Sequence, residues 1–92
     1  LEKAIEVINT TGMELATDPL WKEFIIKPPQ FLRVEDFLES GVVLKILGET
    51  VPLKQWEVTG ELRKRIKFSF EREGIEMPTL QRFMNPPQDS GV

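Results

Sequence analysis

The sequence predicts an α+β fold with two main helices on one face of a small, mainly antiparallel sheet. Two stretches carry the 3.6-residue apolar period of a core-facing helix, and they flank two strand-like segments joined by a glycine-containing link. A last strand, marked by Pro78, follows the second long helix. With 92 residues, of which 40% are hydrophobic and 29% charged, the chain suits one small domain.

The first predicted helix starts with the chain and runs for about four turns. Gly12 lies on its apolar stripe, although glycine costs about 1 kcal/mol in a helix interior relative to alanine. Either another backbone approaches closely at this point or the helix tolerates the glycine, and the sequence leaves both readings open. The stripe consists of Leu1, Ala4, Ile5, Ile8, Gly12, Leu15 and Ala16.

A second, short helix is predicted over residues 20–25, because Asp18 and Pro19 supply an N-cap and a first-turn proline. Two prolines at 28–29 are expected to end it. Residues 31–38 and 42–50 then alternate as strands, with a turn at 39–41, so they should pair as antiparallel neighbours. The first of these strands is the more polar and is expected at an edge of the sheet.

The longest helix is predicted over residues 54–73, and Gly74 with Ile75 behind it fits a left-handed C-cap with its hydrophobic contact. Phe68 lies about 140° from the centre of the buried stripe at 3.6 residues per turn. That phenylalanine is therefore either merely exposed or part of an interface. The stripe consists of Val58, Leu62, Ile66, Ser69 and Phe70.

A short strand is expected to begin at Ile75, before Pro78 restricts it to an edge or a bend. The domain is expected to span residues 1–84. Residues 85–92, with two prolines and small polar side chains, should form a disordered tail.

The composition argues against an enzyme, a cofactor protein and a nucleic-acid module. The chain has no cysteine and no histidine, which removes the usual zinc ligands and the commonest general base. A net charge of −3 lacks the basic surplus that phosphate contacts need. The carboxylates of Glu35, Asp36 and Glu39, with Asp18 or Glu49, show no spacing typical of an acid/base pair or an ion site. We therefore expect no catalytic residue, no cofactor and no metal.

Four basic residues lie on the longest helix, and they leave two readings open. Arg63, Lys64, Arg65 and Lys67 could form a binding patch with Phe68, or they could belong to a solvated face that neighbouring glutamates dilute. No apolar run approaches the roughly 20 residues that cross a bilayer, so any membrane contact is expected to come from segments outside this chain.

An ordered set of short motifs resembles the cytoplasmic C-terminal region of small-conductance mechanosensitive channels, the MscS family. The resemblance covers roughly residues 2–83. The motifs are Asp18-Pro19-Leu20-Trp21-Lys22, Pro28-Pro29, Val34-Glu35-Asp36-Phe37, Ser40-Gly41-Val42-Val43-Leu44, Gln55-Trp56, Glu61-Leu62-Arg63-Lys64-Arg65-Ile66-Lys67, Phe70 and Gly74-Ile75.

The resemblance implies a ferredoxin-like β-α-β-β-α-β domain lacking its first strand, because the family places a strand before the first helix. The loss of that strand would leave ladder hydrogen bonds open and invite pairing with another chain. The family forms a hollow heptameric cage below the pore, on the cytoplasmic side of the cell membrane. Permeating ions and small solutes reach the pore through openings in that cage.

The resemblance also implies where copies of the chain would meet. The final strand of the family contributes to a small barrel on the cage axis, although Thr79 and Leu80 depart from its usual aromatic and proline. Phe68 departs as well, since the family typically has a charged residue there. The expected subunit contacts are Met77, Pro78, Thr79, Leu80, Gln81, Arg82, Lys64, Lys67 and Phe68. The alternative is a free-standing ferredoxin-like module that binds a small ligand or nucleic acid through the basic helix.

Overall fold

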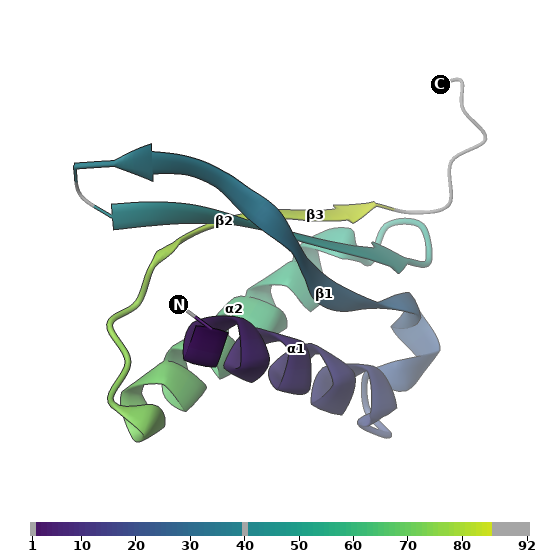
Figure 1. Cartoon of the computed structure of the whole chain (residues 1–92). Coiled ribbons are helices and arrows are strands. Elements are labelled where there is room, and N and C mark those ends of the chain that lie inside the picture. Colours follow the sequence, from purple (N-terminus) through teal and green to yellow (C-terminus); the bar gives the residue numbers. More distant parts are fainter. Residues whose placement is uncertain (1, 40, 86–92) are drawn as a thin grey trace.

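The computed structural model describes residues 2–39 and 41–85, and it shows two helices packed on one face of a three-stranded sheet (Figure 1). This confirms the predicted α+β class. The strand order is β1-β2-β3, so β2 is central. The elements in chain order are α1 (Glu2–Thr17), the 3₁₀ helix η1 (Lys22–Phe24), β1 (Ile25–Leu38), β2 (Gly41–Thr50), α2 (Gln55–Glu73) and β3 (Thr79–Asn85).

The hairpin of β1 and β2 is antiparallel, as predicted, and its register places apolar residues opposite each other. Phe31 lies opposite Ile46 and Val34 opposite Leu44 on the face toward the helices. The strand β1 starts at Ile25, earlier than expected, and passes through the two prolines. An edge strand tolerates these prolines because one row of its backbone groups has no ladder partner.

The predicted short helix over residues 20–25 is wrong. Asp18 does not cap a helix; its Oδ1 accepts a hydrogen bond from the Leu20 amide at 2.8 Å and closes a turn. Only the three residues of η1 are helical, and Phe24 O then accepts a hydrogen bond from the Val51 amide at 2.9 Å. Because this long-range hydrogen bond uses the Phe24 carbonyl, the helix does not continue, and the chain is extended from Ile25 onward.

The last strand pairs with β2 in parallel, from Val43 opposite Thr79 to Glu49 opposite Asn85. It begins at Thr79 rather than Ile75, since Pro78 has no amide hydrogen to donate to a ladder. We expected the missing first strand to leave ladder hydrogen bonds open; in the structure β3 pairs with β2, whose other neighbour is β1. Of the expected tail over residues 85–92, Asn85 is the last residue of β3, and residues 86–92 lie outside the described part of the chain.

The core lies between the sheet and the two helices, and the predicted stripe of α2 is buried in full. Thr11 of α1, which the apolar period missed, is buried against Ser69 of α2 with their hydroxyl oxygens 3.3 Å apart. The buried apolar residues are Ala4, Ile8, Leu15, Leu44, Ile46, Val58, Leu62, Ile66 and Phe70. Residues from α1, β2 and α2, which are far apart along the chain, thus share one core.

Two glycines have conformational reasons for their places. A Cβ at Gly12 would collide with the carbonyl oxygen of the buried Pro29 and lie 3.1 Å from its carbonyl carbon, so α1 approaches β1 closely here. This decides the question that the sequence left open. Gly74 has φ of 72° and ψ of 26°, and the Ile75 amide donates to Phe70 O at 2.9 Å, which confirms the predicted C-cap.

None of the helices in the described residues is long and apolar enough to cross a membrane.

Candidate functional site

The outer face of α2 presents Lys64, Lys67 and Phe68, which we call the Phe68 surface. Phe68 is 62% exposed because the helix turns its buried stripe to the sheet and leaves this side chain on the solvent side. Lys64 Nζ lies 3.5 Å from Glu61 Oε1, and Lys67 has no ion-pair partner among the described residues. The structure therefore brings three of the predicted contact residues together on one helix.

The other predicted contact residues lie in and before the last strand. Met77, which is 39% exposed, and Pro78 belong to the connection between α2 and β3. The remaining four, Thr79 to Arg82, lie within β3 opposite residues 43–46 of β2. The predicted residues thus lie in two parts of the domain, one set on α2 and one in β3 with the connection before it.

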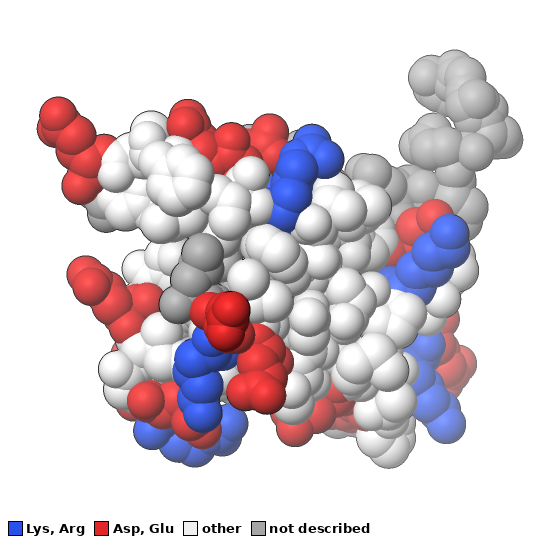
Figure 2. Space-filling view, viewed as in Figure 1, with Lys and Arg blue, Asp and Glu red and all other residues white. Residues whose placement is uncertain are grey.

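A cavity of about 510 Å³ lies where the connection from α2 to β3 passes the end of the hairpin, and we call it the hairpin-end cavity. Its lining is mostly apolar, and Glu39 and Glu76 add two exposed carboxylates. Figure 2 shows acidic side chains projecting at the left edge of the molecule, with uncharged surface between them. The apolar lining includes Ala4, Val42, Ile75, Met77 and Pro78.

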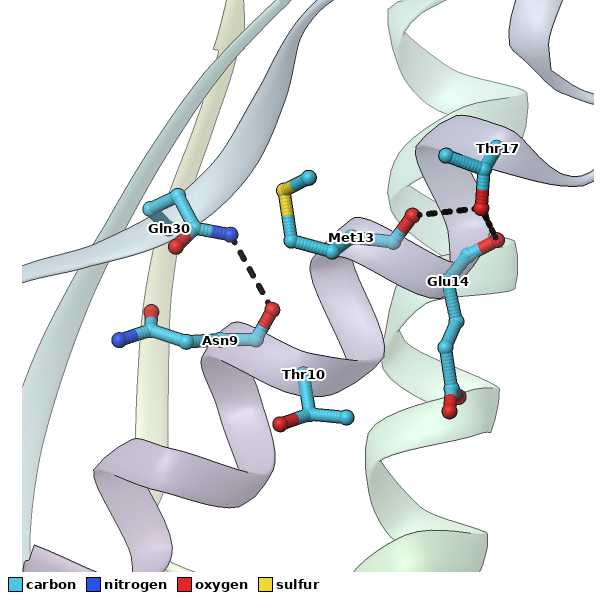
Figure 3. A pocket seen from close by; sticks show the side chains of 6 residues that line it. All are labelled: Asn9, Thr10, Met13, Glu14, Thr17 and Gln30. Atoms are coloured by element: carbon cyan, nitrogen blue, oxygen red, sulfur yellow. Dashed lines mark hydrogen bonds between the residues drawn. The ribbon is translucent and has the colours of Figure 1, made fainter.

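A second, shallow groove of about 380 Å³ runs along α1 beside β1 (Figure 3). Its polar groups are largely used in local hydrogen bonds. Gln30 Nε2 donates to Asn9 O at 3.2 Å, and Thr17 Oγ1 donates to Met13 O at 3.0 Å. Asn9 Oδ1 accepts from the Phe31 amide at 2.7 Å. These groups hold α1 against β1, and the groove offers no nucleophile paired with a base.

The carboxylates that the sequence singled out are not brought together. Glu35 pairs with Arg33 at 3.1 Å, and Glu49 pairs with Lys27 at 3.3 Å. Asp36 accepts a hydrogen bond from the next backbone amide at 2.7 Å. Within residues 2–39 and 41–85, no group of three or more acidic side chains could hold a metal ion. Glu35, Asp36 and Glu49 thus each have a local partner, and Glu39 is exposed at the end of the hairpin.

Arg65 connects α2 to the turn that follows α1. Its Nη2 donates to Asp18 Oδ2 at 2.7 Å and its Nε donates to Glu61 Oε2 at 2.8 Å. The hydrogen bond from Arg65, followed by that from the Leu20 amide, lowers the pKa of Asp18 below its ordinary 3.8. The hydrogen bond from Arg65 likewise lowers the pKa of Glu61 below its ordinary 4.5.

Replacing Arg65 with methionine is expected to weaken the fold near neutral pH but hardly below the two lowered pKa values. A carboxylate with a depressed folded-state pKa stabilises the fold above its unfolded pKa, and this contribution is lost as the pH falls through the folded pKa. Urea unfolding of the wild type and the variant as a function of pH measures the difference. Arg63→Met is the matched control, because Arg63 is exposed and has no ion pair among the described residues. A difference in unfolding free energy between wild type and Arg65→Met that stays constant as the pH falls through the acid range would contradict the expectation.

The hairpin-end cavity is the feature that the sequence missed. Its lining comes from the start of α1, the hairpin and the connection after α2, so no periodic pattern could reveal it. Only the exposure of Phe68 carried a usable signal, and that residue lies on a different surface.

Comparison with known proteins supplies the family. The sequence model described as "Mechanosensitive ion channel MscS, C-terminal" matches residues 1–77. A small-conductance mechanosensitive channel of Caldanaerobacter subterraneus subsp. tengcongensis is 28% identical over 57 residues, which are 62% of this chain and 20% of that protein. The moderate conductance mechanosensitive channel YbiO of Escherichia coli strain K12 is 27% identical over 77 residues, which are 84% of this chain and 10% of that protein. No solved structure gives a significant match.

Proposed function

Because the chain belongs to the family of C-terminal domains of MscS mechanosensitive ion channels, we propose that it is the cytoplasmic cage domain of a channel that relieves osmotic pressure. The observation that carries the proposal is the family match over residues 1–77, which includes both helices and the hairpin. The chain spans a fifth of one curated relative and a tenth of the other. The pore and the membrane-spanning segments are therefore assigned to parts of the protein outside this chain.

The proposed role is assembly and filtering, without catalysis. Copies of the domain form a ring, heptameric by family resemblance, below the pore on the cytoplasmic side of the membrane. Ions and small solutes pass between the copies on their way to the pore. One feature supports this role: the predicted contact residues lie on two different parts of the domain, α2 and the last strand with the connection before it. A ring needs two different surfaces on each copy, because each copy contacts one neighbour on either side.

A chimeric channel tests the proposal. Residues 2–85 replace the matching segment of the Caldanaerobacter channel, and the chimera is expressed in cells that lack their own mechanosensitive channels. We expect the chimera to rescue survival after a sudden drop in external osmolarity and to open under tension in membrane patches. The control carries Phe70→Ala, which removes a core side chain and should abolish the rescue. A chimera that is well expressed and reaches the membrane but never opens would contradict the proposal.

A further inference from the structure

We propose that the hairpin-end cavity of one copy receives Phe68 of a second copy, with Lys64 and Lys67 placed beside the carboxylates of Glu39 and Glu76. The inference rests on the proposed assembly of copies and assigns the surfaces that meet. It joins the Phe68 surface to the connection that holds Met77 and Pro78, which so far were two unrelated candidates.

The cavity has the size and the lining for an aromatic ring. The hairpin-end cavity is open to solvent and measures about 510 Å³, more than the roughly 150 Å³ of an enclosed apolar cavity that binds benzene. Ala4, Val42 and Ile75 give it buried or half-buried apolar walls, and Met77 is 39% exposed beside them. A flexible methionine adapts to the shape of an inserted ring. Such a lining binds an apolar side chain more favourably than a polar one.

The rim of the cavity selects for basic neighbours around that side chain. Glu39 and Glu76 are exposed, and neither has an ion-pair partner among the described residues. Lys3, beside Ala4, is already paired with Glu73 at 3.4 Å. The two rim carboxylates therefore remain available to cations of a partner, and partial burial at an interface would strengthen their attraction.

Phe68 is the exposed aromatic side chain that satisfies both requirements. It projects from the outer face of the long helix α2 and is 62% exposed. Lys64 lies one helical turn before it on the same side, and Lys67 precedes it in the sequence, about 100° around the helix. Lys67 has no ion-pair partner among the described residues. An aromatic ring flanked by two cations thus complements an apolar cavity flanked by two carboxylates.

Trp56 provides the contrast that makes the assignment specific. It is 78% exposed, more than Phe68. Both residues have an acidic neighbour, Glu57 directly after Trp56 and Glu71 one turn after Phe68. The cations differ: Lys64 lies one turn before Phe68, although it is 3.5 Å from Glu61, whereas Thr59 and Gly60, one turn after Trp56, are uncharged. Exposure alone would therefore favour Trp56, whereas the neighbouring cations favour Phe68.

A second copy is the occupant that the chain itself supplies. Each copy carries one Phe68 surface and one hairpin-end cavity, on different elements, so the contact is heterologous and can close into a ring. The chain has a net charge of −3, so copies repel each other overall unless opposite charges meet locally. This pairing places the basic part of one copy against the acidic end of the next.

Disulfide trapping tests the contact, because the chain has no cysteine of its own. One copy carries Glu71→Cys, one turn after Phe68, and the other carries Met77→Cys in the cavity. Mild oxidation of the mixture is expected to link these two copies. Glu57→Cys, next to Trp56, is the matched control and is expected to link poorly to the Met77→Cys copy. Adding Phe68→Ala to the Glu71→Cys copy should abolish the link, and adding Trp56→Ala should not.

Charge reversal provides a second readout. Lys64→Glu with Lys67→Glu in the first copy should abolish the link, and Glu39→Lys with Glu76→Lys in the second copy should restore it. Circular dichroism of each variant checks that the fold is kept. Suppose that the copies associate in sedimentation but the yield of the disulfide link does not change with Phe68→Ala or with either charge change. This result would overturn the contact and leave the proposed assembly standing. Copies that neither link nor associate at any concentration would overturn both.

Discussion

Replacing Phe70 with alanine is expected to lower the free energy of unfolding by about 3 to 5 kcal/mol, the usual cost of removing a buried phenylalanine. Phe70 is 1% exposed and is the largest fully buried side chain in the described residues. A domain of 92 residues has a total stability of roughly 5 to 14 kcal/mol. The variant should therefore lose between about a fifth and all of the stability of the domain.

Urea unfolding followed by circular dichroism measures this loss, and Phe68→Ala is its matched control. Both residues are phenylalanines of α2, but Phe68 is 62% exposed and packs on no core. We expect its replacement to change stability by no more than about 0.5 kcal/mol, as is usual for surface substitutions. Equal losses of unfolding free energy in the two variants would contradict the orientation of α2, in which Phe70 is buried and Phe68 exposed.

Gly12→Ala is expected to destabilise the domain although alanine is the better helix former. The new Cβ would collide with the backbone of Pro29, which cannot rotate away as a flexible side chain can. Overpacking of this kind costs about 1 to 3 kcal/mol. We expect a steric cost in the upper part of that range, because the new Cβ meets a backbone carbonyl group. The roughly 1 kcal/mol that alanine gains in helix propensity reduces the net loss of stability.

Gly60→Ala is the opposite control for the same substitution. Gly60 is an exposed residue inside α2, and a Cβ there would meet no atom within 4 Å. The alanine should stabilise the domain by about 0.4 to 1 kcal/mol, since it restricts the unfolded chain and suits the helix. Thermal unfolding of both variants measures whether the melting temperature falls for Gly12→Ala and rises for Gly60→Ala. A gain in stability for Gly12→Ala would contradict the close approach of α1 to β1.

The two main helices and the hairpin could be predicted because their patterns are local. The stripe of α2, its C-cap at Gly74 and the turn at 39–41 each depend on residues within a few positions of one another. The segment at 20–25 was mistaken for a helix, since the signal at Asp18 and Pro19 suits a turn as well as an N-cap. A hydrogen bond from Val51, far along the chain, decided between them.

The candidate contact surfaces divide in the same way. The outward position of Phe68 follows from helical periodicity, and the structure agrees with it. The hairpin-end cavity could not be foreseen, because its walls come from distant segments whose spacing along the chain carries no signal. The pairing of β3 with β2 was also missed, since parallel strands joined by a helix have no short turn to mark them.

The sequence by itself determined the two long helices, the hairpin and the apolar face of the longer helix. These properties depend on the period of the apolar residues and on the residue types present. The tertiary structure alone decided why Gly12 must be glycine, where β3 pairs and that a cavity opens at the hairpin end. Each of these depends on the distance between atoms far apart in the chain, which is set when all the elements pack on one core.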